Sequence, residues 1–501
     1  MNAASARTVT FLLAATALAA ARGSDTSPSA SQPWVGDEAA TYPRPNVQLG
    51  PSDLPARALS LGDLIDLALR DNPDTRSSWQ VAVQAAANHN RAVGAFLPDL
   101  SGGVSFSKQY QKTDGALTSG PFSVPQVEIV NSPSVFVSPS ASLTWMLWDF
   151  GTSKATMDAA KNALIGANFS HNRTLQGVVR QVQSAYFGYD AARGAEAAAD
   201  AGADLAAATL NATMIKRQSG LSSLTDELQA RQSEMQARMQ REQARFAYEQ
   251  ARAQLFEIAG LPPSDTIVIA EQAPGTEPTP ALGAVAALVA QALATRPDIA
   301  ARYAKVAALE DSLKRAQRGF LPTVVFTSSV NRLRGEQSTV SSQGVDNPTA
   351  IQQASISRYN TAGFIETASA GISVNADVTS LFTYNHVVAE KRAEIDAAKS
   401  ELRSALITAE HDVWLSVDAC QGARDQFAEA KELLDISQKS FDASQKARNS
   451  GLQSTLDLLQ AQQQLAQARY TLVQARARMF TSAADLAFAT GQTPTGSTPG
   501  G

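Results

Sequence analysis

The chain has 501 residues, of which 44% are hydrophobic and only 6% aromatic, and its formal net charge at pH 7 is −5. Dispersed charges of this balance exclude the concentrated basic surface that nucleic-acid binding requires, so we expect no nucleic-acid partner. The single cysteine, Cys420, excludes an intrachain disulfide and a multi-cysteine zinc site. We interpret it as a packing residue on a helix face.

Residues 1–21 predict a cleaved secretory signal, and residues 22–59 an extension after it. Arg7 precedes the apolar run TVTFLLAATALAAA, which is too short to span a bilayer and ends in small residues. No later stretch approaches the roughly 20 apolar residues of a membrane helix. If the mature chain enters a membrane, we therefore expect it to do so as β-strands.

Two similar halves follow, at 60–260 and 284–491, joined by a linker at 261–283. Each half opens with the i, i+3, i+4, i+7 stripe of an amphipathic helix, interrupted by proline, at Leu61–Asp74 and Val285–Asp298. The motifs after it recur in the same order. We infer the duplication of a whole domain rather than a short solenoid repeat. The last segment, 492–501, is expected to be a disordered tail.

After an FLP sequence in each half, the hydrophobic period changes to that of a strand. Alternation predicts four strands, at about 99–111, 135–148, 323–333 and 367–379. Loops rich in Ser, Gly and Pro are expected between the paired strands, at 112–134 and 334–366. The apolar face offers eight candidates for the outer, lipid-facing side of a barrel: Val104, Phe106, Leu143, Trp145, Val324, Phe326, Ile372 and Val374.

Four strands are too few to close a barrel, for which about eight is the practical minimum. The strands therefore predict an oligomer, in which three copies would supply twelve strands. A soluble hairpin packed on a helical body is the alternative interpretation of the same alternation.

Each half ends in two long helices joined at a glycine, near 220 and near 451. The first of these, at about 153–219, would be roughly 100 Å long. Heptad spacing in the returning helices is typical of a coiled coil. The seam residues are Leu452, Leu459, Ala466, Val473 and Phe480 in the second half and Leu221, Leu228, Met235, Met239 and Phe246 in the first. An ordinary rod-like coiled coil has the same spacing.

These features together resemble the TolC-like outer-membrane efflux protein family: the secretory signal, the two halves, FLP ahead of each strand pair, LTWMLWDFG at 143–151 and the GLxS tips. The resemblance covers about 60–490. It implies a mainly α fold with a membrane β-barrel, in which three protomers form a 12-stranded barrel and a long α-helical coiled-coil tunnel. Such a homotrimer lies in the outer membrane lipid and extends into the periplasm. It has no cofactor and no metal.

The resemblance also implies a passive exit duct for a tripartite efflux pump or type I secretion system. The duct opens at its periplasmic mouth on docking to a periplasmic adaptor (membrane fusion) protein and an inner-membrane transporter, either an RND-type pump or an ABC transporter. The hairpin tips implied to meet the adaptor are Gly220, Leu221, Ser223, Gly451, Leu452 and Ser454.

Acidic residues ring the mouth in this family, and the resemblance places Asp457 there. Gln460 occupies the second acidic position, and Asp226 and Gln229 are the first-half equivalents. Both aspartates also complete an S-x-x-D sequence that caps a helix. The gating and capping roles are compatible.

No HExxH motif, nucleophile elbow or phosphate loop occurs, and the four histidines are isolated in the sequence, so we expect no enzymatic activity. The competing interpretation is a periplasmic coiled-coil adaptor or scaffold protein. An adaptor usually has one helical hairpin, whereas this chain predicts two hairpins and two strand pairs.

Overall fold

The structure is a computed structural model that describes residues 57–119, 122–262, 267–270, 283–343, 356–377, 379–450 and 452–492. The predicted signal peptide, most of the extension, Gly451 and nearly all of the C-terminal tail lie outside the described residues. All described residues belong to one unit of the chain, Pro51–Gly501.

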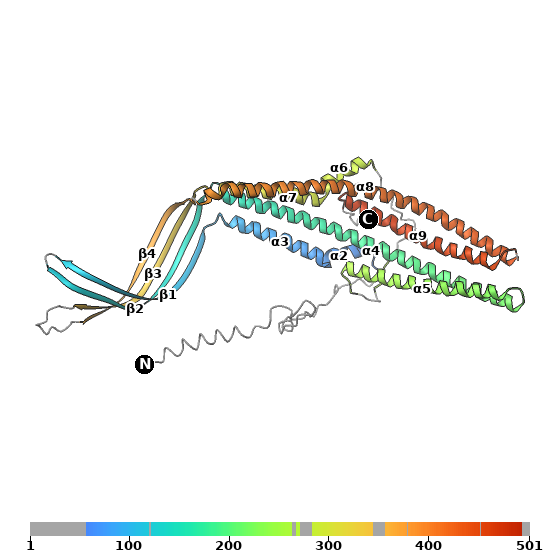
Figure 1. The fold of residues 1–501 in the computed structure, drawn as a ribbon, viewed down its shortest axis with the longest axis horizontal. Coiled ribbons are helices and arrows are strands. Elements are labelled where there is room, and N and C mark those ends of the chain that lie inside the picture. Colours follow the sequence, from blue (N-terminus) through green and yellow to red (C-terminus); the bar gives the residue numbers. More distant parts are fainter. Residues whose placement is uncertain are drawn as a thin grey trace, which may run out of the picture. The chain divides into compact units, whose positions relative to one another are not determined.

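The order helix, helix, strand, strand, long helix, long helix occurs twice (Figure 1). The first half contains α2 (Leu61–Asp71), α3 (Pro73–Gly94), β1 (Asp99–Ser119), β2 (Phe122–Trp148), α4 (Thr152–Gln218) and α5 (Leu224–Ala259). The second contains α6 (Val285–Thr295), α7 (Pro297–Arg318), β3 (Thr323–Gln343), β4 (Ile356–Asn375), α8 (Thr379–Asn449) and α9 (Thr455–Ala489). Each predicted helix and strand is therefore present, in duplicate.

Proline begins a helix in each half. Pro73 and Pro297 occupy the first positions of α3 and α7, where the missing N–H costs no hydrogen bond. The last helix of each half ends beside this proline junction. α5 ends at Ala259 and α9 at Ala489, and the glycines that follow, Gly260 and Gly491, have left-handed φ values of 70° and 73°. The carbonyl of Thr490 accepts a 2.9 Å hydrogen bond from the side chain of Thr295.

The four strands form one antiparallel sheet in the order β1-β2-β3-β4. All four strands are longer than predicted, and β4 also ends earlier. β1 and β2 continue through most of the loop expected at 112–134, and β3 and β4 through much of that expected at 334–366, while β4 ends at Asn375 rather than near 379. The prediction of a long loop at 112–134 was therefore wrong. The predicted loop at 334–366 is too long, and its middle, 344–355, lies outside the described residues.

Ladder pairing explains this error. Glycine, serine and proline in these segments indicated loops, but the backbone is paired across the sheet from Gln111–Asn131 to Ser119–Phe122. Pro125 and Pro133 lie beside the register shifts, where proline is tolerated because ladder hydrogen bonds are interrupted. Local composition thus predicted loops where pairing with distant strands stabilises β-structure.

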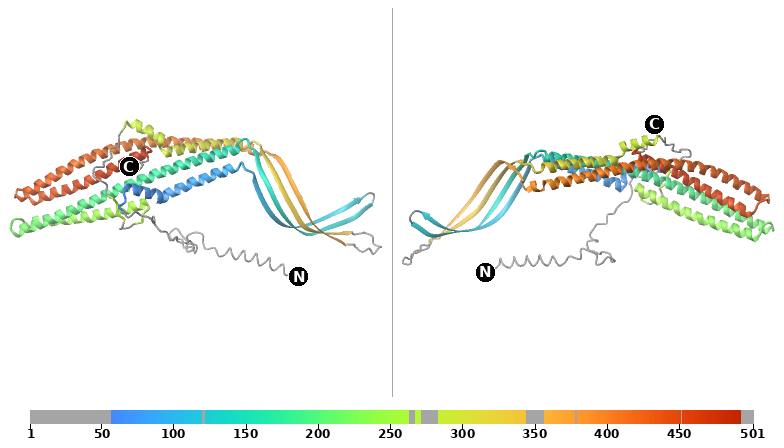
Figure 2. Two further views of the ribbon diagram at one scale, coloured as in Figure 1. Left: turned by 180° about the vertical axis from the view of Figure 1, so that it is seen from behind. Right: turned by 45° about the horizontal axis from the view of Figure 1, so that its top comes forward.

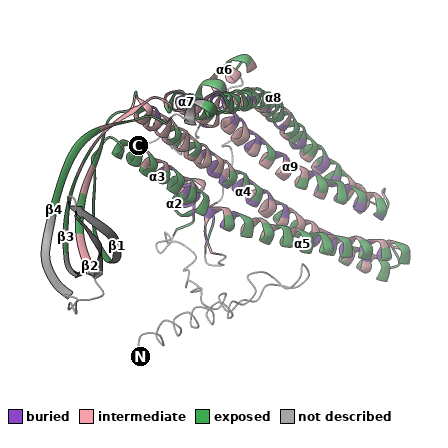
Figure 3. Ribbon diagram, turned by 60° about the vertical axis from the view of Figure 1, so that its left-hand side comes forward, coloured by how far each residue is buried: buried purple, intermediate pink, exposed green. Residues whose placement is uncertain are grey.

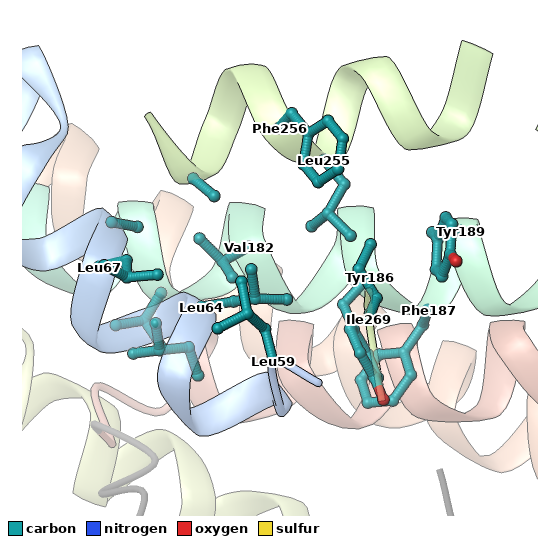
Figure 4. Packing of buried hydrophobic residues seen from close by; sticks show 14 of the residues in the cluster. Leu59, Leu64, Leu67, Val182, Tyr186, Phe187, Tyr189, Leu255, Phe256 and Ile269 are labelled. Carbon is teal, nitrogen blue, oxygen red and sulfur yellow. The ribbon is translucent and has the colours of Figure 1, made fainter. Parts of the chain in front are cut away.

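The largest core lies where α2 packs across α4 and the end of α5 (Figure 4). Leu64 of α2 meets Val182 of α4 and Leu255 of α5, and all three side chains are fully buried. A smaller core repeats this arrangement in the second half, with α6 against α8 and α9. Cys420 is fully buried there, which confirms its interpretation as a packing residue.

An ionic cluster joins the two halves beside these cores. Arg296, only 4% exposed, bonds Asp298 at 2.8 Å and Asp412 of α8 at 3.0 Å. Arg173 of α4 lies 3.5 Å above the ring of Phe488 and donates a 3.1 Å hydrogen bond to its carbonyl. Burial lowers the pKa of Arg173 to about 10. Arg173 also lies 3.7 Å from Asp298, so the long helix of the first half is fixed to the start and the end of the second.

The predicted seams are not equivalent in the structure. In the second half Leu459 and Phe480 of α9 are buried and Leu452, before α9, is exposed. In the first half all five seam residues are exposed: Leu221, Leu228, Met235, Met239 and Phe246. Figure 3 shows exposed residues along much of α5. The apolar stripe of α5 is exposed in the single copy because it faces away from α4. Among the described helices, none has a segment long and apolar enough to cross a bilayer.

Candidate functional site

The α4–α5 turn and the α8–α9 turn lie at the same end of the long helices, away from the strands, in both views of Figure 2. α9 packs against α4 and contacts α5. The structure therefore brings the two predicted tips into one region.

Both turns close in the same way. Leu221 N–H donates to the carbonyl of Lys216 at 2.8 Å, and Leu452 N–H donates to that of Ala447 at 2.9 Å. Gly220 has a φ of 74°, the left-handed conformation that glycine adopts without a steric penalty. Leu221 and Leu452 are 75% and 82% exposed, so each tip carries an exposed leucine.

A complete capping box starts each returning helix. The Ser223 hydroxyl donates to the Asp226 carboxylate at 2.7 Å and accepts from the Asp226 backbone at 3.1 Å. In the second half the Ser454 hydroxyl likewise donates to the Asp457 carboxylate at 2.7 Å and accepts from the Asp457 backbone N–H at 3.2 Å. The predicted capping role of both aspartates is therefore confirmed, while their gating role stays a prediction.

Asp226 also interacts with the other hairpin. Hydrogen bonds from the backbone and side chain of Ser223, with further ones from Ser222 and Thr455, lower the pKa of Asp226 to about 2. Thr455 is the first residue of α9 and is almost fully buried. Its hydroxyl accepts a 2.6 Å hydrogen bond from Arg448 at the end of α8. Arg448, Thr455 and Asp226 thus link the two tips.

Sequence reasoning missed the arginines that cross each turn. Arg448 donates a hydrogen bond to Thr455. Its equivalent in the first half, Arg217 (448 minus 231), forms an ion pair with Glu227. Glu227 also lies 3.5 Å from Arg231. The signal was present, because an arginine stands three residues before the tip glycine in both RQSG and RNSG.

A groove of about 1150 Å³ separates α5 from α9 above α4. Small residues of α4, such as Ala195 and Gly202, form its floor, and its walls are rich in glutamine. Gln460 lines the groove, whereas Asp457, Asp226 and Gln229 are not among its lining residues. No acidic residue lines it. Of the four predicted gate residues, only Gln460 lines this groove.

The register of the sheet places all eight candidate outer-face residues on one face. Trp145 pairs with Phe326, and Phe326 pairs with Ile372. The other face carries a row of serines that crosses all four strands: Ser101, Ser142, Ser329 and Ser369. Side-chain hydrogen bonds of 2.7 and 2.8 Å join the outer two pairs of this row. One face is apolar and the other is lined with hydroxyl groups.

The family model described as "Outer membrane efflux protein" matches residues 64–261 and 288–492. The chain belongs to this family. Its two matched segments correspond to the two structural halves, and the predicted fold class, mainly α-helical with four strands and an internal duplication, is confirmed. No curated protein matches the chain.

Solved outer-membrane channels share the fold. CmeC of Campylobacter jejuni is 18% identical, with a TM-score of 0.67 over 86% of this chain and 85% of its own. The open state of MtrE of Neisseria gonorrhoeae is 20% identical, with a TM-score of 0.66 over 89% and 94%. VceC of Vibrio cholerae is 17% identical, with a TM-score of 0.67 over 86% and 96%.

Within the described residues, no group of three or more His, Cys, Asp or Glu side chains is arranged to hold a metal ion. The chemistry of the site is that of helix caps, ion pairs and a polar groove.

Proposed function

We propose that three copies of this protein build a passive exit duct through the outer membrane, with a long extension into the periplasm. The observation that carries this proposal is the sheet. One of its faces is apolar and the other is lined with hydroxyl groups, as a wall between lipid and water requires. The strands continue directly into helices of 67 and 71 residues, which would be about 100 Å long.

The exposed apolar residues of the helices support assembly from several copies. Met239 and Phe246 of α5 are 63% and 65% exposed, and Ile436 and Trp414 of α8 are similarly open. Monomeric proteins rarely leave such stripes uncovered. Packing of α5 against α8 of the next copy would cover both and close a ring. Three copies would bring twelve strands into one closed sheet.

The hairpin tips form the periplasmic mouth in this proposal. The link from Arg448 through Thr455 to Asp226 holds the closed state, and Asp457 with Gln460 faces the passage. Docking of a periplasmic adaptor and an inner-membrane transporter, of the RND or ABC type, separates the hairpins. Leu221 and Leu452 are the exposed side chains that an adaptor would cover.

Fractionation and conductance test the duct. The full-length protein should be extracted from the outer membrane as a trimer and should form ion-conducting pores in planar bilayers. A soluble monomer without conductance would reject the duct and favour the adaptor or scaffold alternative.

Ion selectivity tests the mouth. Asp457→Ala should reduce the preference for cations, because the charge lining a constriction determines which ions enter. Gln460→Glu should increase it. Asp435→Ala, which removes an exposed carboxylate of α8 away from the tip, is the matched control. Unchanged selectivity and conductance in both Asp457→Ala and Gln460→Glu would remove these positions from the mouth.

A further inference from the structure

The face of the sheet that carries the serine row, which we call the hydroxyl face, has three neighbouring rows of residues that cross all four strands. On one side of the serine row lie Gly103, Ser140, Asn331 and Thr367. On the other side lie Asp99, Thr144, Thr327 and Gly371. Asp99 is the only ionisable residue in these three rows, and it lies at the helix end of β1.

The strands carry other charges, but these lie on the apolar face. Successive residues of a strand point to opposite faces. Lys108 follows Phe106 at a spacing of two, and Arg332 follows Val330 in the same way. Arg332 forms a 3.2 Å ion pair with Glu366 on that face. The two faces therefore differ in charge as well as in hydrophobicity.

Hydroxyl groups of the serine row bond to each other. Ser101 and Ser142 are joined at 2.7 Å, and Ser329 and Ser369 at 2.8 Å. Each bond uses one of the two O–H donors in its pair. Hydrogen bonds between neutral groups are about half as strong as those of an ionised group, and water competes with them. A solute beside this face therefore meets neutral groups that do not retain it.

Screening limits the reach of Asp99. A closed sheet of twelve strands has a radius of about 12 Å, from strands about 4.8 Å apart and inclined by about 40°. Ser140 is four residues from Thr144, which pairs with Asp99, and four residues of strand are about 13 Å long. The Debye length at about 0.1 M salt is about 10 Å. Both the axis of the passage and the row of Ser140 therefore lie beyond the screening distance from Asp99.

We propose that the strand section of the duct does not discriminate by charge and passes anionic and cationic solutes equally. The class of solute that it admits is any water-soluble molecule that fits, of either sign. Discrimination by charge belongs to the helical section, which ends at the tips with Asp457. This inference rests on the proposed exit duct.

Thiol modification by reagents of opposite charge tests this neutrality. Ser140→Cys and Asn331→Cys each place a thiol in one row of the hydroxyl face, at positions that are exposed. The wild-type protein is the blank, because its single cysteine, Cys420, is fully buried. The full-length trimer in phosphatidylcholine nanodiscs is treated with trimethylammonium-ethyl methanethiosulfonate, a cation, or with sulfonatoethyl methanethiosulfonate, an anion. Nanodiscs leave both ends of the passage open to the reagents.

The measured quantity is the ratio of the two reaction rates, divided by the same ratio for 2-mercaptoethanol. Both reagents react with the same thiolate, so the ratio removes differences in thiol reactivity. At about 0.1 M salt it should be about one at Ser140→Cys and at Asn331→Cys, because no fixed charge of these rows lies within a Debye length.

Ser101→Cys is the matched probe beside the charge, since it lies two residues from Asp99 (101 minus 99). It should favour the cationic reagent about threefold, from the field of a carboxylate about 7 Å away. Adding Asp99→Asn should abolish this preference and leave the ratio at Ser140→Cys unchanged.

A preference of about threefold or more at Ser140→Cys or Asn331→Cys, for either reagent, would overturn the proposal, because it requires a charge within the screening distance. Val104→Cys, on the apolar face, distinguishes this failure from that of the duct. Lipid should protect it from both reagents. If it reacts as fast as Ser140→Cys, the sheet is not in a bilayer and the duct proposal fails.

The remaining outcomes separate the two proposals further. If the hydroxyl face reacts with neither reagent, it lines no aqueous passage, and both the duct and this inference fail. An unequal ratio together with a protected Val104→Cys rejects this inference alone.

Discussion

At the start of α5 the chain buries Glu227, Ala230 and Glu234, whereas at the start of α9 it buries Leu458, Ala461 and Leu465. These are equivalent positions, 231 residues apart (458 minus 227). The turns and caps before them are almost identical. The two hairpins therefore use one backbone plan with opposite side-chain chemistry on the buried face.

The difference determines what holds each hairpin together. Leu458 and Leu465 pack with Phe441 of α8 in an apolar cluster, which is insensitive to salt. Glu227 and Glu234 are instead held by ion pairs with arginines, including Arg217 of α4. The first hairpin depends on charge and the second on burial. We expect the α8–α9 hairpin to stay rigid, and the stability of the α4–α5 hairpin to depend on salt concentration.

Leu465→Ala should give the largest effect. Its side chain is 1% exposed, and removing a buried leucine side chain costs about 2–5 kcal/mol. Amide hydrogen exchange should accelerate near the start of α9 and leave α5 unchanged. Leu456→Ala, at a half-exposed position of the same helix, is the matched control and should have little effect. Equal loss in both variants would show that the apolar cluster does not hold this hairpin.

Glu227→Ala and Glu227→Leu separate charge from packing in the first hairpin. Glu227→Ala leaves Arg217 without its carboxylate partner and should lower local stability by about 1–3 kcal/mol. Glu227→Leu supplies the residue of the second hairpin and should be neutral or stabilising, because well-packed apolar groups often replace buried ion pairs without loss.

Salt dependence gives the second measurement on these variants. Exchange at the start of α5 should accelerate with increasing salt in the wild type and not in Glu227→Leu, since salt screens partly exposed ion pairs. If α5 and α9 respond equally to salt in the wild type, the contrast between the hairpins is wrong.

Ser223→Ala and Ser454→Ala should have smaller and equal effects. Each removes the hydroxyl of a capping box, at a cost of about 0.5–2 kcal/mol. Exchange of the Asp226 and Asp457 amides, which lose their acceptor, reports the change. A large difference between the two would mean that the tips differ in their caps as well as in their buried faces.

Acid should give the smallest effect. We expect it to be confined to the hydrogen bond that the Ser223 amide donates to the Asp226 carboxylate in the first capping box. The pKa of Asp226 is lowered from 3.8 to about 2 in the folded chain, chiefly by hydrogen bonds from Ser223. The ionised carboxylate therefore contributes stability that is present above pH 3.8 and is lost as the pH falls through about 2. Exchange of the Ser223 amide should accelerate over this window in the wild type and should be flat in Asp226→Asn.

Several features of the fold were predictable because they are encoded locally. The prolines at 73 and 297, the S-x-x-D caps and the glycine at 220 each specify a backbone conformation within a few residues. Alternation over 99–106 and 368–374 also identified the apolar face of the sheet, because a strand has a period of two. The duplication was visible as the same order of such signals.

The misplaced elements depended on partners far away in the chain. The segments 112–119 and 122–134 are rich in loop-forming residues and are nevertheless strand, since their hydrogen bonds are made to neighbouring strands. The heptad stripe of α5 was correctly located in the sequence, but its spacing did not indicate which side of the helix faces α4. The link from Arg448 to Asp226 joins residues 222 apart (448 minus 226), beyond any local pattern.

The sequence by itself determined the repeated plan of helices and strands, the caps and turns at both tips, and the polarity of each strand face. These follow from preferences that act over a few residues. Only the tertiary structure decided how far the strands extend and which stripe each hairpin buries. Those features arise from ladder register and helix packing, where the free energy belongs to pairs of segments and is invisible in either segment alone.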